Sequence, residues 1–334
     1  MKHVNDTSIM RRRQILASAS LLMLGAVTIP VVAQTAYPTK PITIIVPYAP
    51  GGQGDVFARL IGERLGARLK QTVIVDNRPG ATGALGSRLA AKAAPDGYTL
   101  LMGQTGEMAV NKSVVKTLGY DPIKDFTPVV LVGDAPLVLA APANSPFNSI
   151  QELVLAARAK PGSINYASSG TATPGHLAAA ALAIGTKTDM AHVPYKGAGQ
   201  AMTDLLGGHV QFFFSSASAV MGHVKSGKLK ALAVSTPQRL AALPQVPTVA
   251  ESEIGGFSYS LWGGLFAPAG TPEAVVELLN REVNAILLEP ALRDRLEADG
   301  SAVRPNTPAQ FGQFLGREIS KYEGLVKATG IQAE

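Results

Sequence analysis

The chain has 334 residues, of which 46% are hydrophobic and 16% charged; this length suits two domains, and this composition supports a packed core and excludes intrinsic disorder. The absence of cysteine excludes disulfides, thiolate catalysis, cysteine-based zinc sites and a lipoprotein anchor. The net charge is +6, but half of it lies in residues 1–33, so the sequence gives little support for nucleic acid binding.

Residues 1–33 have the three parts of a secretory signal peptide: positive charge at Arg11, Arg12 and Arg13, an apolar run, and small residues before the cleavage site. We expect cleavage after Ala33, with Ala36 as second choice. A membrane anchor is the alternative, but the apolar run is barely long enough to span a bilayer and contains Ser, Gly and Pro. The paired arginines leave the Sec and twin-arginine export routes both open.

The remaining sequence alternates between short apolar runs and helical segments. Strands are predicted at 42–46, 72–75, 99–102, 128–132, 137–140, 164–167, 190–193, 211–214 and 229–234. Helices are predicted around Ile61, Leu65 and Leu69, at 82–92, after the cap residue Ser149, at 175–184, 198–206 and 217–226, and after Thr271 and Thr307, which each precede a proline at the first helical position. This alternation predicts an α/β fold with mostly parallel strands, in which every strand-to-helix loop reaches the ligand-binding edge of its sheet.

The first of these loops, residues 47–55, is rich in glycine and proline. Glycines let the backbone approach a ligand, and the start of the next helix offers unpaired N–H groups to an anion. A dinucleotide fingerprint through Gly52 and Gly54, with Asp76 as the ribose acid, fails because Phe57 replaces the third glycine. The loop is therefore interpreted as an anion-binding loop, with a purely structural turn as the alternative.

Two later loops have similar chemistry. Residues 166–176 carry four hydroxyl side chains and glycines between a strand and a helix, which suits a carboxylate and equally suits a helix N-cap cluster. In residues 192–197 we interpret Tyr195 as a pocket wall and Lys196 as a solvated charge. His192 is interpreted as a structural histidine, with a ligand role as the alternative.

Sequence motifs of enzymes are absent. The chain has no G-x-S-x-G elbow, H-E-x-x-H motif or Walker loop, and its single histidines lack metal-ligand spacing. Loops rich in amides without an activated nucleophile predict binding without turnover, and no cofactor. A hydrolase or transferase whose catalytic groups meet only in three dimensions remains the competing class.

The chain resembles the Bug-type receptors, the periplasmic solute-binding proteins of the tripartite tricarboxylate transporter family, along its whole mature length. The motifs that carry this resemblance are Tyr37-Pro38-x-Lys40-Pro41-Ile42, Pro50-Gly51-Gly52-x-x-Asp55-x-x-Ala58-Arg59, Asp76-Asn77-Arg78-Pro79-Gly80-Ala81-x-Gly83, Pro95-Asp96-Gly97-Tyr98-Thr99-Leu100, Tyr120-Asp121-Pro122-x-x-Asp125-Phe126, residues 192–197, Asp204-Leu205-Leu206-Gly207-Gly208, Leu243-Pro244-x-Val246-Pro247-Thr248-Val249-x-Glu251 and Ala267-Pro268-Ala269-Gly270-Thr271-Pro272.

The resemblance implies a two-lobed periplasmic-binding-protein fold, type II-like, that closes on its ligand by hinge motion. Lobe 1 would comprise residues 34–135 and 262–334, and lobe 2 residues 136–261. The ligand contacts implied are Tyr48, Pro50, Gly51, Gly52, Gln53, Asp55, Thr82 and Thr105 on one side of the cleft, and Ser168, Ser169, Gly170, Thr173 and Tyr195 on the other. The expected function is capture of a small carboxylated metabolite in the periplasm by a monomer, for a membrane permease or a sensor protein.

The sequence departs from the family pattern at the second loop. Ala178 and Ala179 follow His176-Leu177, where the family often has a Gly-Glu pair. Amino acids, aromatic carboxylates and neutral amides therefore remain possible beside dicarboxylates and tricarboxylates. Asp55 near an anion is interpreted as a residue that caps its helix, with an ammonium group of the ligand as the alternative partner.

Overall fold

The computed structural model describes residues 37–298 and 300–332. The predicted signal peptide and its cleavage site lie outside the described residues. Within the described part, no helix is both long enough and apolar enough to cross a membrane.

The first part of the fold is built on three parallel strands, β1 (Ile42–Val46), β2 (Val73–Asn77) and β3 (Thr99–Gln104). Strand β1 reads ITIIV, and its side chains are almost entirely buried, as a strand covered on both faces requires. Strand β3 pairs antiparallel with β9 (Ser260–Pro268), which in turn pairs with β4 (Phe126–Pro142). The surrounding elements are α2 (Gln53–Leu69), a 3₁₀ turn (Ala81–Gly83), α3 (Ala84–Ala91), a π turn η2 (Gly106–Val110), α4 (Asn111–Val114), α10 (Glu273–Leu287), α11 (Pro290–Ala298) and α12 (Pro308–Thr329).

The second part repeats the alternation. Strand β4 continues into it and pairs with β7 (Phe212–Ser216) and β8 (Leu229–Val234), and β5 (Ile164–Ser168) lies parallel to both β7 and β6 (Met190–Pro194). Its helices are α5 (Ile150–Ala159), α6 (Pro174–Thr186), α7 (Ala198–Leu206), α8 (Ala217–Lys225) and α9 (Val249–Ser252). The predicted alternation of strands and helices is thus found in both parts.

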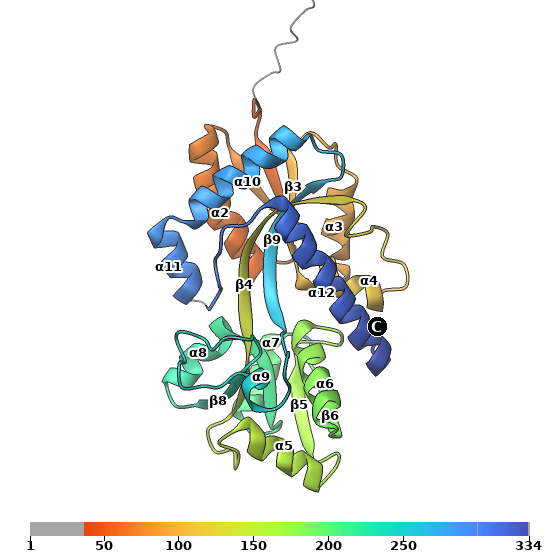
Figure 1. The fold of residues 1–334 in the computed structure, drawn as a ribbon, viewed down its shortest axis with the longest axis vertical. Helices are drawn as coiled ribbons and strands as arrows, with labels where there is room; N and C mark the ends of the chain where they lie inside the picture. The colour runs from red at the N-terminus through yellow and green to blue at the C-terminus, as the bar shows by residue number, and fades with distance from the viewer. Residues whose placement is uncertain (1–36, 299, 333–334) are drawn as a thin grey trace, which may run out of the picture. The chain divides into compact units, whose positions relative to one another are not determined.

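Strands β4 and β9 join the two parts (Figure 1). Up to Pro136, β4 pairs with β9, and from Leu137 it pairs with β7 and β8, so that a nine-stranded sheet runs through the molecule. The sequence predicted two strands here, at 128–132 and 137–140, and this was wrong. Gly133, Asp134 and Pro136 interrupt the apolar pattern, but irregular register between β4 and β9 accommodates them without ending the strand.

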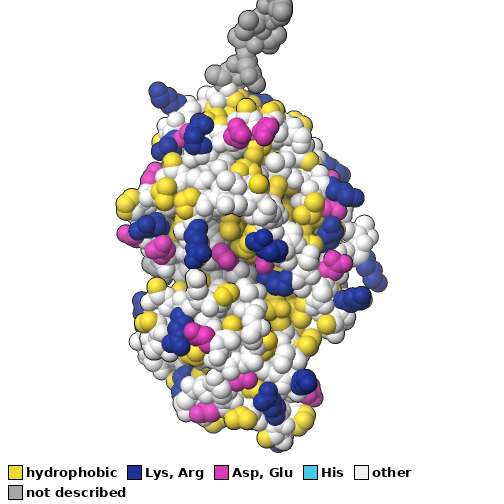
Figure 2. Space-filling model, in the orientation of Figure 1, with side chains coloured by type: hydrophobic (Ala, Val, Ile, Leu, Met, Phe, Trp, Pro, Cys, Tyr) yellow, Lys and Arg dark blue, Asp and Glu magenta, His cyan; other side chains and the backbone are white. Residues whose placement is uncertain are grey.

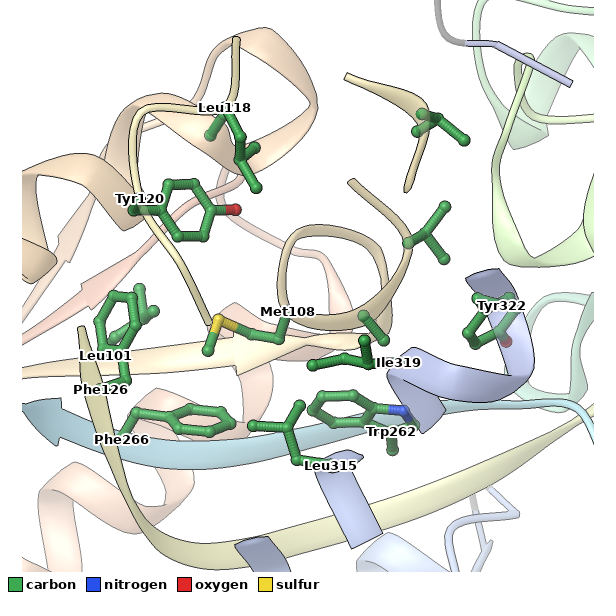
Figure 3. Packing of buried hydrophobic residues seen from close by; sticks show 14 of the residues in the cluster. Leu101, Met108, Leu118, Tyr120, Phe126, Trp262, Phe266, Leu315, Ile319 and Tyr322 are labelled. Carbon is green, nitrogen blue, oxygen red and sulfur yellow. The ribbon is translucent and has the colours of Figure 1, made fainter. Parts of the chain in front are cut away.

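The buried core beside this junction is aromatic. Leu315 and Ile319 of α12 pack with Trp262 of β9, as Figure 3 shows. Gly264 of β9 lies close to the ring of Phe311, where a side chain would not fit.

On the face drawn in Figure 2, acidic and basic side chains are interspersed, which is typical of a protein surface without a single charged patch.

Two of the three predicted caps are confirmed. Ser149 and Thr307 are N-caps whose side chains accept hydrogen bonds from backbone N–H groups three residues on, and Thr307 forms a capping box with Gln310. The third prediction, Thr271 as the N-cap of its helix, was wrong by one residue. Pro272 is the N-cap of α10, and the Thr271 hydroxyl donates to the Pro268 carbonyl of the preceding turn.

Candidate functional site

The candidate site is formed by loops that follow the parallel strands. Three of them leave the carboxyl ends of β1, β2 and β3, and two leave the carboxyl ends of β5 and β6. Strands that run parallel end at the same edge of their sheet, so each set of loops is gathered at one edge. Of the thirteen residues predicted as ligand contacts, Ser168 ends strand β5, and the others lie in these loops or in the first turns that follow them.

The glycine-rich loop leads into α2 without a side-chain cap. Gly51 has φ of +87°, which favours glycine, and the N-cap Gly52 offers no side-chain acceptor to the first turn of the helix. Gly51, Gly52 and Pro50 are exposed. The backbone N–H groups at the start of α2 are therefore suited to an anion from outside the chain.

Asp55 is bonded to its own loop and helix. Its carboxylate accepts from the Gly51 N–H at 3.0 Å and pairs with Arg59 at 2.9 Å. The hydrogen bond from Arg59 lowers the pKa of Asp55, which keeps the carboxylate ionised. Asp55 reaches back from the first turn of α2 to the residue before the N-cap Gly52, so it fixes the loop and is not a cap of the helix itself. Its partners explain the buried charge without a ligand ammonium group.

Tyr48 connects the glycine-rich loop to the loops after β2 and β3. Its hydroxyl lies 2.8 Å from Glu107 Oε2 and 3.3 Å from the Thr82 carbonyl oxygen, which also accepts from Asn111 Nδ2 at 3.0 Å. Burial raises the pKa of Glu107 to about 8. The sequence reasoning missed Glu107 and Asn111; the one signal was a lone acid before the apolar run 108–110.

Gln53 and Thr105 are tied to β9. Gln53 Nε2 donates to the Leu261 carbonyl at 3.1 Å, and the Thr105 hydroxyl accepts from the Trp262 N–H at 2.9 Å. Thr105 is 1% exposed, and its hydroxyl lies within reach of the Ser260 carbonyl as well. These two predicted site residues thus hold the loops to the strand that connects the two parts of the fold.

The hydroxyl-rich loop is held together by its own side chains. Ser168 Oγ lies 2.7 Å from His192 Nε2 and 3.2 Å from the Gly170 nitrogen, and the Thr173 hydroxyl donates to the Gly170 carbonyl at 2.7 Å. Thr173 is the N-cap of α6, yet its side chain makes no bond to the helix. The helix start is therefore left open, as at α2, and the N-cap alternative does not account for the hydroxyls.

Two stacked histidines lie under this loop. The rings of His176 and His192 have centroids 3.6 Å apart, and His176 Nδ1 accepts from the Ala172 N–H at 3.0 Å. Burial lowers the pKa of His176 to about 4, with a further contribution from His192, and burial also lowers the pKa of His192. Both rings are neutral near pH 7. The bond from His192 to Ser168 and its stacking on His176 agree with the interpretation of His192 as structural, which stays a prediction.

The loop after β6 joins the hydroxyl-rich loop. The Tyr195 N–H donates to the Ser168 carbonyl at 3.1 Å, while its hydroxyl donates to Asp204 at 2.6 Å. Ser169 is partly buried beside them, and Lys196 is exposed. The predicted residues of the second part thus form one group around Ser168.

The arrangement favours binding over catalysis. Ser168 and His192 are close enough for a nucleophile and its base, but Ser168 is 0% exposed. Among the described residues no cluster of histidine, aspartate and glutamate could hold a metal ion. What both loop groups offer is open helix starts and short hydroxyls, which bind a carboxylate without a paired cation.

Comparison with known proteins supports this assignment. The family model described as "Tripartite tricarboxylate transporter family receptor" matches residues 57–331. Protein BugT of Bordetella pertussis is 37% identical over 325 residues, which cover 97% of this chain and 99% of that protein. The chain is thus similar to that protein along its whole length.

Solved structures are similar to the fold. Rpa4515 of R. palustris, solved with adipate, is 33% identical with a TM-score of 0.80, over 89% of this chain and 100% of that one. MatC of Rhodopseudomonas palustris, solved with bound malate, is 34% identical with a TM-score of 0.75, over 87% of this chain and 100% of that one. Both of these proteins hold a small dicarboxylate.

Proposed function

Because this chain belongs to the tripartite tricarboxylate transporter receptor family, we propose that it captures a small carboxylated metabolite in the periplasm and delivers it to a membrane permease. The predicted family is confirmed, and so is the predicted fold class, the two-lobed periplasmic-binding-protein fold. The single observation that carries the choice of ligand is the pair of open helix starts at Gly52 of α2 and Thr173 of α6, where no side chain caps the backbone N–H groups.

The ligand would lie between two lobes, made of residues 34–135 with 262–334 and of residues 136–261. The change of strand partner between Pro136 and Leu137 supports this division, because β4 leaves β9 there and enters the second half of the sheet. Strands β4 and β9 connect the lobes and would have to bend for the lobes to close, as in hinge motion. Contacts of α12 with the second lobe, such as the bond from Lys321 Nζ to the Ser258 carbonyl, would have to change as well.

Each lobe would contribute one set of contacts. Lobe 1 would bind one end of the ligand through the loops around Tyr48, Pro50, Gly51, Gly52, Gln53, Asp55, Thr82 and Thr105, and lobe 2 the other end through Ser168, Ser169, Gly170, Thr173 and Tyr195. Thr105 and Asp55 act here by holding the loops, since their polar atoms already have partners in the chain. The relatives solved with adipate and malate favour a dicarboxylate, and Ala178 and Ala179 leave amino acids and aromatic carboxylates as further candidates.

The binding proposal is tested by thermal denaturation of the mature protein with adipate, malate, amino acids and pyridine carboxylates. A ligand that binds only the folded state stabilises it, by about 2.7 kcal/mol at a concentration one hundred times its Kd. We expect a dose-dependent rise in Tm for at least one carboxylate, and titration calorimetry then gives its Kd. If the whole panel leaves the Tm unchanged, the receptor proposal is wrong.

The same samples distinguish a receptor from the enzyme alternative. We expect NMR spectra of the ligand to remain unchanged after prolonged incubation with the pure protein, because the site offers no accessible nucleophile. Conversion of many equivalents of a panel compound would overturn the receptor proposal in favour of a hydrolase or transferase.

A further inference from the structure

The hydroxyl of Tyr48 is shared by loops from three neighbouring strands. It belongs to the loop after β1, and it lies 3.3 Å from the carbonyl oxygen of Thr82 in the loop after β2 and 2.8 Å from Glu107 Oε2 in the turn after β3. Both neighbours accept hydrogen bonds, yet a phenol has one proton to donate. The protonation state of Glu107 therefore decides which of the two receives it.

Glu107 is enclosed by the protein. The π turn η2 directs it inward, it is 0% exposed, and its Oε1 accepts from the Gln104 N–H at 2.5 Å. The titratable groups that face it are Tyr48 and Tyr120, whose hydroxyl donates to the Glu107 carbonyl oxygen at 2.6 Å.

Charged groups on the surrounding helices are directed elsewhere. Arg88 of α3 donates to the Ala84 carbonyl and acts on Tyr120. On α12, which packs against η2, Glu318 binds Trp262 Nε1 and Lys321. None of these groups supplies Glu107 with a paired cation. Burial therefore dominates and raises the pKa of Glu107 to about 8, so the carboxyl is largely protonated at neutral pH.

The two protonation states differ in their hydrogen bonds. In the neutral state the Glu107 O–H donates to Tyr48 Oη, and the Tyr48 O–H donates to the Thr82 carbonyl, so that all three loops are linked. When Glu107 loses its proton to solvent, the Tyr48 O–H turns to the carboxylate. The Thr82 carbonyl then keeps only the bond from Asn111.

We propose that Glu107 is a proton-dependent positioning residue, which fixes the ligand loops while it is neutral and weakens binding of carboxylates when it ionises. This inference rests on the proposed function of the loops. Ionisation of Glu107 weakens the binding of a carboxylate in two ways. It places a negative charge on a buried side chain that is bonded to Tyr48 of the glycine-rich loop, whose N–H groups are meant for an anion. It also releases one of the bonds that hold Thr82, whose φ of +51° is strained for a threonine.

Binding of a dicarboxylate at two pH values is the first test. Titration calorimetry with adipate and with malate should give a Kd that rises about tenfold between about pH 7 and about pH 9 in the wild-type protein, since the lower-affinity form becomes the major one above the pKa of Glu107. Glu107→Gln keeps the neutral arrangement, because its amide donates to Tyr48 Oη while its oxygen accepts from Gln104. The variant should bind as the wild type does at about pH 7 and lose the pH dependence.

Glu318→Gln is the matched control, because it removes another buried carboxyl that contacts none of the ligand loops. It should keep the pH dependence of the wild type. A pH-independent Kd in the wild type, or the same loss of pH dependence in both variants, would overturn the role of Glu107.

A second measurement needs no ligand. In assigned ¹⁵N–¹H spectra of the free protein, the amides of Gly51, Gly54 and Gly83 should shift together with a midpoint near pH 8, and these shifts should vanish in Glu107→Gln. Absence of that titration would contradict the inference. If the amides titrate but no carboxylate binds at any pH, the loop coupling stands and the proposed ligand class is wrong, so the two failures are distinguishable.

Discussion

At the scale of single residues, the side chains near the candidate site divide by whether their polar atoms already have partners. The hydroxyls of Thr105 and Tyr195 and the carboxylate of Asp55 are bonded within the chain, so these residues shape the loops. Gly52 is exposed and presents only backbone, whereas the N–H of the neighbouring Gly51 is already bonded to Asp55. Ser168 lies between these cases, because it fixes Gly170 while it is buried beside His192.

Replacement of Ser168 tests that position. Ser168→Ala removes the bond to His192 and the acceptor for the Gly170 N–H, and we expect weaker carboxylate binding by about 1–3 kcal/mol. Titration calorimetry measures the change, and circular dichroism checks that the fold is kept. Ser163→Ala, which removes a hydroxyl at the opposite end of β5, should leave the affinity unchanged. Equal affinities for the wild type and Ser168→Ala would remove this loop from the site.

At the scale of secondary-structure elements, β4 and β9 help to position both loop groups, those after β1, β2 and β3 and those after β5 and β6. Gln53 and Thr105 attach the first group to β9, and Ser216 at the end of β7 pairs with Leu137 of β4. Strand β9 includes consecutive glycines at 263 and 264, each packed against an aromatic ring. The close approach of those rings explains why small residues occupy the strand there.

A side chain at residue 264 would disturb this packing. In Gly264→Ala the new Cβ would lie 2.6 Å from Phe311 Cε1 and 2.9 Å from the Val130 carbonyl oxygen, so we expect a loss of about 1–3 kcal/mol in the free energy of unfolding. Urea denaturation monitored by Trp262 fluorescence measures the loss. Gly316→Ala in α12, where a Cβ meets nothing within 4 Å, should be neutral or stabilising by up to about 1 kcal/mol. A fully stable Gly264→Ala protein would contradict this account.

At the scale of the whole molecule, one continuous sheet serves two functions. Its strands contribute to the core of each half, and in the proposed hinge closure its two long strands would bend as the halves move. Ligand affinity would then depend on closure as well as on the contacts of each loop, since a ligand that touches one loop group alone gains only part of the binding energy.

Closure predicts a change in dimensions on binding. Small-angle scattering of the mature protein should show a smaller radius of gyration with a saturating carboxylate than without it. The Ser168→Ala protein at a ligand concentration below its own Kd serves as the control and should keep the radius of the free form. A ligand that binds with calorimetric saturation and leaves the radius unchanged would contradict hinge closure.

Much of the fold and part of the candidate site could be predicted from the sequence. Strands such as β1 and β3 contain apolar runs, and local hydrophobic pattern determines such elements wherever they lie. The loops at 47–55 and 166–176 could be predicted because glycines and hydroxyls between a strand and a helix offer backbone N–H groups and short donors to an anion, whatever the rest of the fold. Residues 192–197 were assigned by their family motif and by the same position between strand and helix.

Tertiary structure alone decided what depends on residues distant in the sequence. The continuity of β4 through Gly133 and Pro136 depends on its partner β9, which supplies the hydrogen bonds across the break in the apolar pattern. Glu107 gained its role from burial and from Tyr48, 59 residues away, because a raised pKa arises from desolvation, which a linear sequence does not contain. The sequence determined which groups the loops offer a ligand, and packing determined which of those groups remain free to bind it.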